Sequence, residues 1–126
     1  MTLVFGGAYQ GKRDWVKREL GYEDSDIFTC RAGDITIETD KPVIDGLHRY
    51  ILALLRAGGD PEALLAARMD RLAGKVIICE DITGGVVPVD AEMRAWREAV
   101  GRCMGLLSAR ADRVVRIFCG LPQHIK

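Results

Sequence analysis

A glycine-rich segment near the N-terminus, Gly6-Gly7-Ala8-Tyr9-Gln10-Gly11-Lys12, has residue types and a spacing that suit phosphate binding. Glycines let successive backbone N–H groups turn inward, and a following helix adds partial positive charge at its N-terminus. The Lys12 ammonium would contact the outer phosphates of a nucleotide. A plain glycine turn is the alternative. The position of the segment, between the apolar run Leu3-Val4-Phe5 and a helix predicted over 12–20, favours the phosphate loop.

The residue after the loop lysine is Arg13, where such loops usually have Ser or Thr. The usual hydroxyl holds Mg²⁺, whereas a guanidinium has no lone pair to offer a cation. Arg13 therefore has two alternatives, a contact with a phosphate or an orientation towards solvent. We include Arg13 with residues 6–12 in the predicted nucleotide-binding set.

Asp45 ends the apolar run Pro42-Val43-Ile44. An acid that ends a core strand beside a phosphate loop holds Mg²⁺ directly or through water. The sequence therefore predicts Asp45 as a metal residue, with Mg²⁺ and ATP or GTP as the cofactors. The alternative is that Asp45 caps the helix that begins near Gly46.

Two adjacent carboxylates, Glu80 and Asp81, follow the apolar run Lys75–Cys79. In open α/β folds, ligands bind at the carboxyl ends of the strands, so this pair indicates the same edge of the sheet. The loop that follows, Ile82–Pro88, contains two glycines. It is either a flap that closes over a substrate or a plain connection.

Apolar runs alternate with amphipathic segments along the whole chain. Parallel strands need crossover connections, which helices supply, so the pattern predicts one α/β domain over residues 1–126 with about five mostly parallel strands flanked by helices. The expected strands are Leu3–Phe5, Ile27–Cys30, Pro42–Asp45, Lys75–Cys79 and Val114–Cys119, with a small edge strand at Ile35–Ile37; the expected helices are 12–20, 46–57, 61–73 and 91–109.

Composition limits the classes of partner. Lys and Arg balance Asp and Glu at 18 each, so nothing global suggests a nucleic acid or an anionic membrane. No apolar run approaches the roughly 20 residues of a membrane span, and no secretory signal is present, so we expect a cytoplasmic protein. The four cysteines contain no Cys-x-x-Cys pair, which disfavours structural zinc. We expect Cys79 and Cys119 to be buried thiols and His48 to be a half-buried structural residue.

Five segments, in order, resemble the adenosylcobinamide kinase / adenosylcobinamide-phosphate guanylyltransferase family of cobalamin biosynthesis. They cover nearly the whole chain, and the part from Glu80 onward is the most specific. The segments are Phe5–Lys12, Val43–Leu47 (Val-Ile-Asp-Gly-Leu), Val86–Asp90 (Val-Val-Pro-Val-Asp), Arg94–Arg102 and Ala111–Pro122.

The resemblance implies a RecA-like P-loop NTPase fold, a three-layer sandwich that often assembles as a trimer. It implies phosphorylation of the hydroxyl on the aminopropanol arm of adenosylcobinamide by ATP or GTP. It also implies transfer of GMP from GTP to that phosphate through a guanylylated histidine. The implied partners are a nucleoside triphosphate, a corrinoid and further copies of the chain.

Position by position, the resemblance assigns the loop residues and Lys12 to phosphate binding, and Asp45 and Asp81 to the acids that end two core strands. Lys12, Asp45 and Asp81 are therefore the predicted catalytic residues. The chain departs from the family at Arg13 and in the interval 21–42, which contains no histidine where the family has one. The alternative function is a catalytically impaired subunit that binds a nucleotide or a corrinoid.

Overall fold

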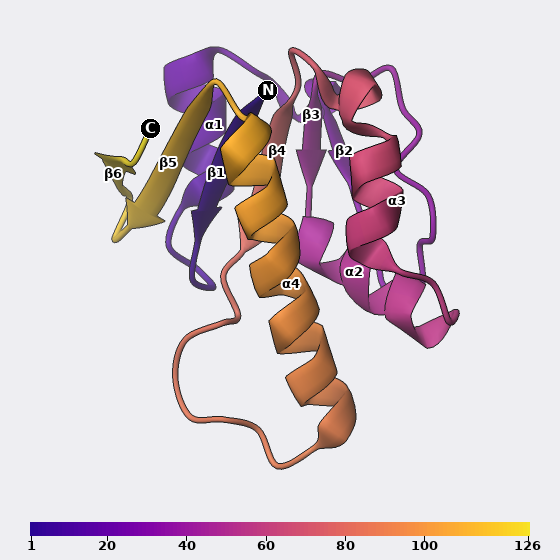
Figure 1. Ribbon diagram of the computed structural model, residues 1–126. Coiled ribbons are helices and arrows are strands. Elements are labelled where there is room, and N and C mark those ends of the chain that lie inside the picture. Colours follow the sequence, from indigo (N-terminus) through magenta and orange to yellow (C-terminus); the bar gives the residue numbers. More distant parts are fainter.

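A computed structural model describes residues 1–126, which form one six-stranded sheet with helices on both faces (Figure 1). The elements in chain order are β1 (Thr2–Gly6), α1 (Lys12–Leu20), the short 3₁₀ helix η1 (Asp24–Asp26), β2 (Ile27–Thr29), β3 (Val43–Asp45), α2 (Leu47–Arg56), α3 (Pro61–Ala67), the 3₁₀ helix η2 (Met69–Leu72), β4 (Val76–Glu80), α4 (Ala91–Arg110), β5 (Arg113–Phe118) and β6 (Leu121–His124).

The strands lie in the order β2-β3-β4-β1-β5-β6. The first five are parallel to one another, as the crossover helices require, and β6 alone is antiparallel. The predicted α/β class and the predicted helix-flanked, mostly parallel sheet are confirmed. None of the helices combines the length and the apolar composition that a membrane span needs.

The C-terminal edge of the sheet differs from the prediction. The chain turns back at Cys119 and Gly120, which both have positive φ (51° and 76°), as in a two-residue hairpin turn. This turn creates β6, which the sequence did not indicate. It also leaves Cys119 exposed, so the prediction of a buried thiol there was wrong, whereas Cys79 is fully buried.

No strand forms at Ile35–Ile37, so the predicted edge strand was also wrong. Ile37 nevertheless packs into the main core, while Ile35 is exposed. The segment is fastened by side chains: Glu38 pairs with Arg68 and Arg71, and the Lys75 ammonium donates to backbone carbonyls. The burial of Ile37 and these side-chain contacts therefore hold the segment, in place of backbone hydrogen bonds to a neighbouring strand.

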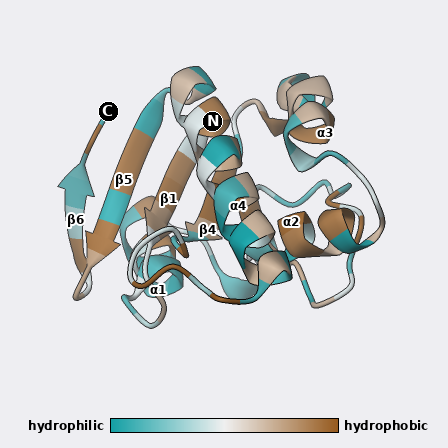
Figure 2. Cartoon of the chain, turned by 60° about the horizontal axis from the view of Figure 1, so that its bottom comes forward, coloured by the Kyte–Doolittle hydropathy of each residue, from teal (hydrophilic) through white to brown (hydrophobic).

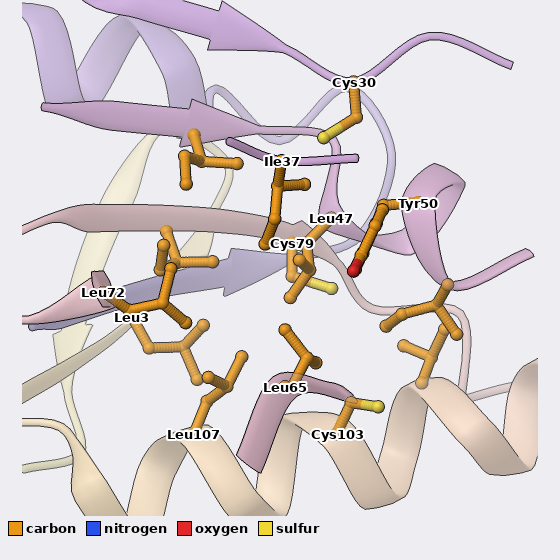
Figure 3. Close-up of a cluster of buried hydrophobic side chains, with 14 of the residues drawn as sticks. Leu3, Cys30, Ile37, Leu47, Tyr50, Leu65, Leu72, Cys79, Cys103 and Leu107 are labelled. Atoms are coloured by element: carbon orange, nitrogen blue, oxygen red, sulfur yellow. The ribbon is translucent and has the colours of Figure 1, made fainter. Parts of the chain in front are cut away.

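The sheet separates two apolar cores. Adjacent residues of a strand point to opposite faces, so Leu3 joins the core under α2, α3 and α4, and Val4 joins the core under α1. Figure 3 shows the larger core, with Leu107 of α4 below Leu3 of the sheet and Leu65 of α3 below Cys79. The brown colouring of β1 and β4 in Figure 2 shows that the central strands are largely hydrophobic, as strands covered on both faces must be.

Helix ends follow the predicted signals. Gly21, with φ 77°, ends α1 in the left-handed conformation that glycine adopts easily. The Asp60 side chain accepts from Ala63 N at the start of α3, and Asp90 accepts from Glu92 N at 2.7 Å at the start of α4. These caps explain why the starts of α3 and α4 were predictable. The predicted extent of the helix over 61–73 was wrong, because the backbone leaves the helical conformation at Arg68 (φ −102°), so that α3 ends at Ala67 and Met69–Leu72 form the 3₁₀ helix η2.

The long connection between β4 and α4 is tied to α4 by arginines. Arg94 donates to the carbonyls of Pro88 and Val89, and Arg97 donates to those of Gly85 and Val86. The loop runs along the lower part of α4 in Figure 1. Two of the four arginines of α4 therefore hold the loop backbone.

Gly6 ends β1 where β5 comes very close. A Cβ atom built on Gly6 would lie 2.3 Å from the carbonyl oxygen of Ile117, which is backbone and cannot move aside. A Cβ atom on Gly7 meets only the side chain of Gln10, at 3.7 Å. Packing against β5 therefore requires glycine at position 6, whereas it leaves room for a side chain at position 7.

We predict that Gly6→Ala lowers the free energy of unfolding by about 1–3 kcal/mol, the usual cost of overpacking. Gly7→Ala should change it by no more than about 0.5 kcal/mol, because the added methyl makes an ordinary contact. Urea unfolding of both variants measures the difference. Equal losses for the two variants would contradict this account of the β1–β5 approach.

Candidate functional site

The loop Gly6–Lys12 lies at the carboxyl end of β1 and leads directly into α1. Tyr9 and Gly11 both have positive φ (57° and 90°), so the backbone curls before the helix begins. The Lys12 ammonium donates to the carbonyl of Gly7 at 2.7 Å, which holds it inside the loop. Burial lowers the pKa of Lys12, while the charges of Glu80 and Asp45 oppose that change.

The turn between β5 and β6 braces this loop. The backbone N–H of Cys119 donates to the side-chain oxygen of Gln10 at 2.7 Å, and the N–H of Gly120 donates to the Gln10 carbonyl at 2.8 Å. Gln10 is thus held by the sheet, while the Tyr9 side chain is fully exposed. The Tyr9 side chain therefore lies outside the loop.

Arg13 takes neither of the two orientations considered from the sequence. Its Nη1 donates to Thr29 Oγ1 at 2.9 Å and to Asp45 Oδ2 at 3.2 Å. Its Nη2 donates to Asp24 Oδ1 at 3.2 Å. The guanidinium therefore joins the start of α1 to the ends of β2 and β3, and its positive charge lies against the predicted metal carboxylate.

Asp45 ends β3, and β4 lies between β3 and the loop strand β1. Its strand is therefore not the direct neighbour of the loop that the sequence suggested. The capping alternative is wrong as well, because Gly46 occupies the position before α2 and no side chain caps that helix. The Asp45 carboxylate instead faces Arg13.

A Mg²⁺ ion prefers octahedral oxygen ligands at about 2.0–2.1 Å, and the side chains around Asp45 do not supply them. Arg13 Nη1 lies on the Asp45 carboxylate, and no three His, Cys, Asp or Glu side chains converge on a common point. As they lie, the side chains do not fit an ion held at Asp45, which would require Arg13 to move. The metal role of Asp45 stays a prediction.

Glu80 and His48 form the neighbouring wall of the site. Glu80 pairs with Gly6 across β4 and β1, so it stands level with the start of the loop. Its backbone N–H donates to His48 Nδ1 at 3.3 Å, which places the ring proton on Nε2, 3.7 Å from Glu80 Oε2. Trp96 Nε1 donates to the His48 carbonyl at 2.8 Å and stacks near its ring.

His48 is buried, more deeply than the half-buried position expected. Burial, together with the positive charges of Arg49 and Lys12, lowers the pKa of His48 to about 4. The imidazole is therefore neutral at pH 7 and acts as an acceptor towards the Glu80 backbone.

Asp81 is turned away from this group. Its Oδ1 accepts from Thr83 N at 2.9 Å and from the Thr83 hydroxyl at 2.5 Å, a local turn at the start of the β4–α4 loop. The structure thus brings Lys12, Arg13 and Asp45 together, and it leaves Asp81 in a separate contact. The catalytic role of Asp81 stays a prediction.

Two cavities meet at this edge of the sheet. One, of about 420 Å³, lies over the start of α1 and is lined by charged residues that include Lys12, Arg13 and Asp45. The other, of about 620 Å³, lies between α2 and α4 and is lined mostly by hydrophobic residues, with Trp96 among them. The two cavities share four lining residues, namely Tyr9, His48, Arg49 and Glu80.

Sequence reasoning missed the position of Glu80 and gave no role to Arg49. The signal for Glu80 was present, since it is the residue directly after the apolar run of β4, but Asp81 was preferred. Arg49 follows no pattern that would separate it from a solvent-exposed helix residue. Only the packing of α2 against the sheet edge places it between the two cavities.

The neutral state of His48 leads to a pH-dependent stability. The folded pKa lies below the unfolded value of about 6.5, so the unfolded chain binds more protons between pH 6.5 and 4, and stability falls as pH is lowered through this range. We predict that His48→Asn, which keeps an acceptor near Nδ1, flattens this slope by up to about 1.4 kcal/mol per pH unit. Urea unfolding at pH 7, 6 and 5 measures it.

The control for this experiment is His124→Asn, on the exposed edge strand. Carboxylates contribute equally to both variants, so their effect cancels in the comparison. Identical slopes for wild type and His48→Asn would contradict a neutral, buried His48.

Comparison with known proteins places these features in a family. A family model described as cobinamide kinase / cobinamide phosphate guanyltransferase matches residues 36–125, which include β3, Glu80 and α4 but not the glycine loop. No curated protein matches the chain. Because the family model covers well over half of the sequence, the chain belongs to the cobinamide kinase / cobinamide phosphate guanyltransferase family of cobalamin biosynthesis.

Proposed function

We propose that this protein binds ATP or GTP at the Gly6–Lys12 loop and phosphorylates the hydroxyl of a cobinamide. The observation that supports the proposal most directly is the half-buried Lys12 ammonium inside a curled loop, at the N-terminus of α1. Backbone amides and an ammonium in such a place stabilise the charge that develops during phosphoryl transfer, which is most of what this chemistry needs.

The proposal is limited to the kinase step. Transfer of GMP through a guanylylated histidine needs an accessible imidazole nitrogen beside the phosphates. The interval 21–42 has no histidine, and His48 is buried with Nδ1 already accepting from Glu80 N. We therefore do not propose that His48 carries a guanylyl group in this protein.

Lys12→Ala should abolish phosphorylation of cobinamide by either nucleotide. It should also remove most of the stabilisation that the nucleotide gives, which is about 2.7 kcal/mol at 100 times the dissociation constant. Radiolabelled phosphate transfer and thermal melts measure the two effects. The matched control is Lys17→Ala, one helical turn further along α1, whose ammonium pairs with Asp24 at 3.1 Å. If the wild type transfers no phosphate from ATP or GTP, the kinase proposal fails.

A second function is favoured by the Arg13–Asp45 ion pair. Because a guanidinium already neutralises Asp45, the protein can hold a nucleotide without using this carboxylate for a metal. Such a protein would be a nucleotide- or corrinoid-binding subunit that does not turn over. It would be stabilised by ATP or GTP and would release no phosphate.

Replacing Arg13 by serine distinguishes the two functions. Arg13→Ser frees Asp45 and supplies the hydroxyl that usually accompanies the loop lysine. If Arg13 takes the place of the metal, as in the second function, nucleotide stabilisation of the wild type will be nearly the same with Mg²⁺ or with EDTA, and that of Arg13→Ser will require Mg²⁺. Thermal melts with ATP and GTP in both conditions check this. A strong Mg²⁺ requirement in the wild type would show that Arg13 does not replace the metal.

A further inference from the structure

The larger cavity has no role in nucleotide binding as proposed above. It lies between α2 and α4, with Leu52 and Ala53 on one side and Trp96 on the other. Its volume of about 620 Å³ is typical of sites for small molecules. A corrin ring with its amide side chains is larger than this, so only a side arm of such a molecule fits inside.

The charged residues that line this cavity indicate which chemical groups it can bind. Arg56 at its rim already pairs with Glu92 at 2.6 Å, so it offers little to an anion. Arg49 has no carboxylate partner, and its only hydrogen bond goes to the Cys30 carbonyl at 3.2 Å. Arg49 is thus the cation of this wall whose charge is uncompensated, and it faces the side shared with the phosphate-loop cavity.

Glu80 occupies the same shared wall. Its side chain is partly exposed, and its position is fixed by the β4 backbone and by His48. Glu80 and Arg49 thus both line the apolar cavity and the phosphate-loop cavity, one as a carboxylate and the other as a cation. The four shared residues therefore lie where two substrates would meet.

We propose that the cavity between α2 and α4 binds the uncharged, largely apolar arm of an alcohol substrate, and that Glu80 and Arg49 on its shared wall act directly in phosphoryl transfer. This inference rests on the proposed kinase function and deepens it. The hydroxyl-bearing arm and the larger body follow from the proposed function, whereas the inference assigns the arm to this cavity and the body to its exposed rim at Ala32, Gly33 and Ala57.

The chemical step balances with these groups alone. The hydroxyl oxygen forms a bond to the γ-phosphorus, and the bond from that phosphorus to the β–γ bridging oxygen breaks with its electron pair leaving on the nucleoside diphosphate. The hydroxyl proton passes to the Glu80 carboxylate and then to solvent. The Arg49 guanidinium contacts the oxygens of the group in transfer.

Ala57→Trp tests the cavity, because it places an indole on the exposed rim without disturbing the core. Cobinamide binding, followed by equilibrium dialysis and corrinoid absorbance, should weaken at least tenfold. The thermal shift with ATP or GTP should be unchanged. Ala109→Trp, at the exposed end of α4, is the control and should bind cobinamide like the wild type. Unchanged cobinamide binding by Ala57→Trp, or no binding by the wild type, overturns the assignment.

Glu80→Gln tests the proton acceptor and keeps the backbone bond to His48. We expect cobinamide and nucleotide binding to persist while turnover falls about 10²–10⁴-fold, the usual contribution of a general base. Arg49→Ala should lower turnover with little change in cobinamide affinity. Glu98→Gln and Arg31→Ala, both exposed, are the matched controls. Wild-type turnover in Glu80→Gln overturns its role.

Failure of the kinase proposal and failure of the cavity assignment give different results in these experiments. If the wild type binds nucleotide but transfers no phosphate, the kinase proposal fails, and the dialysis of Ala57→Trp still decides whether the cavity takes the cobinamide arm. If transfer occurs and Ala57→Trp has no effect on cobinamide binding, the kinase proposal stands and the cavity assignment fails.

Discussion

The parallel pairing of β1 with β4 is the constraint on which the site depends. Its register sets Gly6 opposite Glu80, so the first residue of the loop and the carboxylate of the neighbouring strand stand at one level. Pairing of β4 with β3 in the same direction brings Asp45 to the same edge. A one-residue slip of β4 would turn Glu80 to the other face of the sheet and would bury its charge under α4. Because Val76–Cys79 is apolar on both faces, this run does not fix the register by itself, and the cost of burying the Glu80 charge disfavours the slip.

Two cationic side chains at this edge of the sheet are held in place by hydrogen bonds. Lys12 is held by the loop carbonyl of Gly7, and Arg13 is held by two carboxylates and a hydroxyl. Because Arg13 and Asp45 are both partly shielded from solvent, separating them would leave two poorly solvated charges. The ion pair therefore stabilises the start of α1 against β2 and β3. In most phosphate loops a hydroxyl and a metal ion occupy this place.

Much of the fold was predictable from the sequence, because its signals are local. Apolar runs marked the five parallel strands, and Asp60, Asp90 and Gly21 marked helix ends. The errors came from contacts between distant segments. The φ of Cys119 and the hairpin it makes depend on the loop residue Gln10, more than 100 residues away. Ile37 resembles a strand residue, yet it enters the core from a segment held by ion pairs.

The sequence predicted which residues lie at the site, but it did not predict which of them contact one another. The loop, Asp45 and the Glu80–Asp81 pair all lie at the expected edge of the sheet. Which of two adjacent carboxylates faces the loop is decided by strand parity, and Glu80 shares its face with Val76 and Ile78. The contact of Arg13 with Asp45 spans 32 residues and no pattern in the sequence specifies it.

The short interval between α1 and β3 has a consequence for the second cavity. After β2 the chain runs through Arg31–Gly33 and passes the exposed rim, where Arg49 donates to the Cys30 carbonyl. Farther along the segment, Glu38 pairs with Arg68 at the end of α3, and the Thr39 carbonyl accepts from Lys75, directly before β4. Both ends of the segment are thus fixed by specific contacts, and Ala32 and Gly33 are its residues that line the apolar cavity. Because both residues are small and exposed, this segment leaves the rim of the apolar cavity open beside the loop.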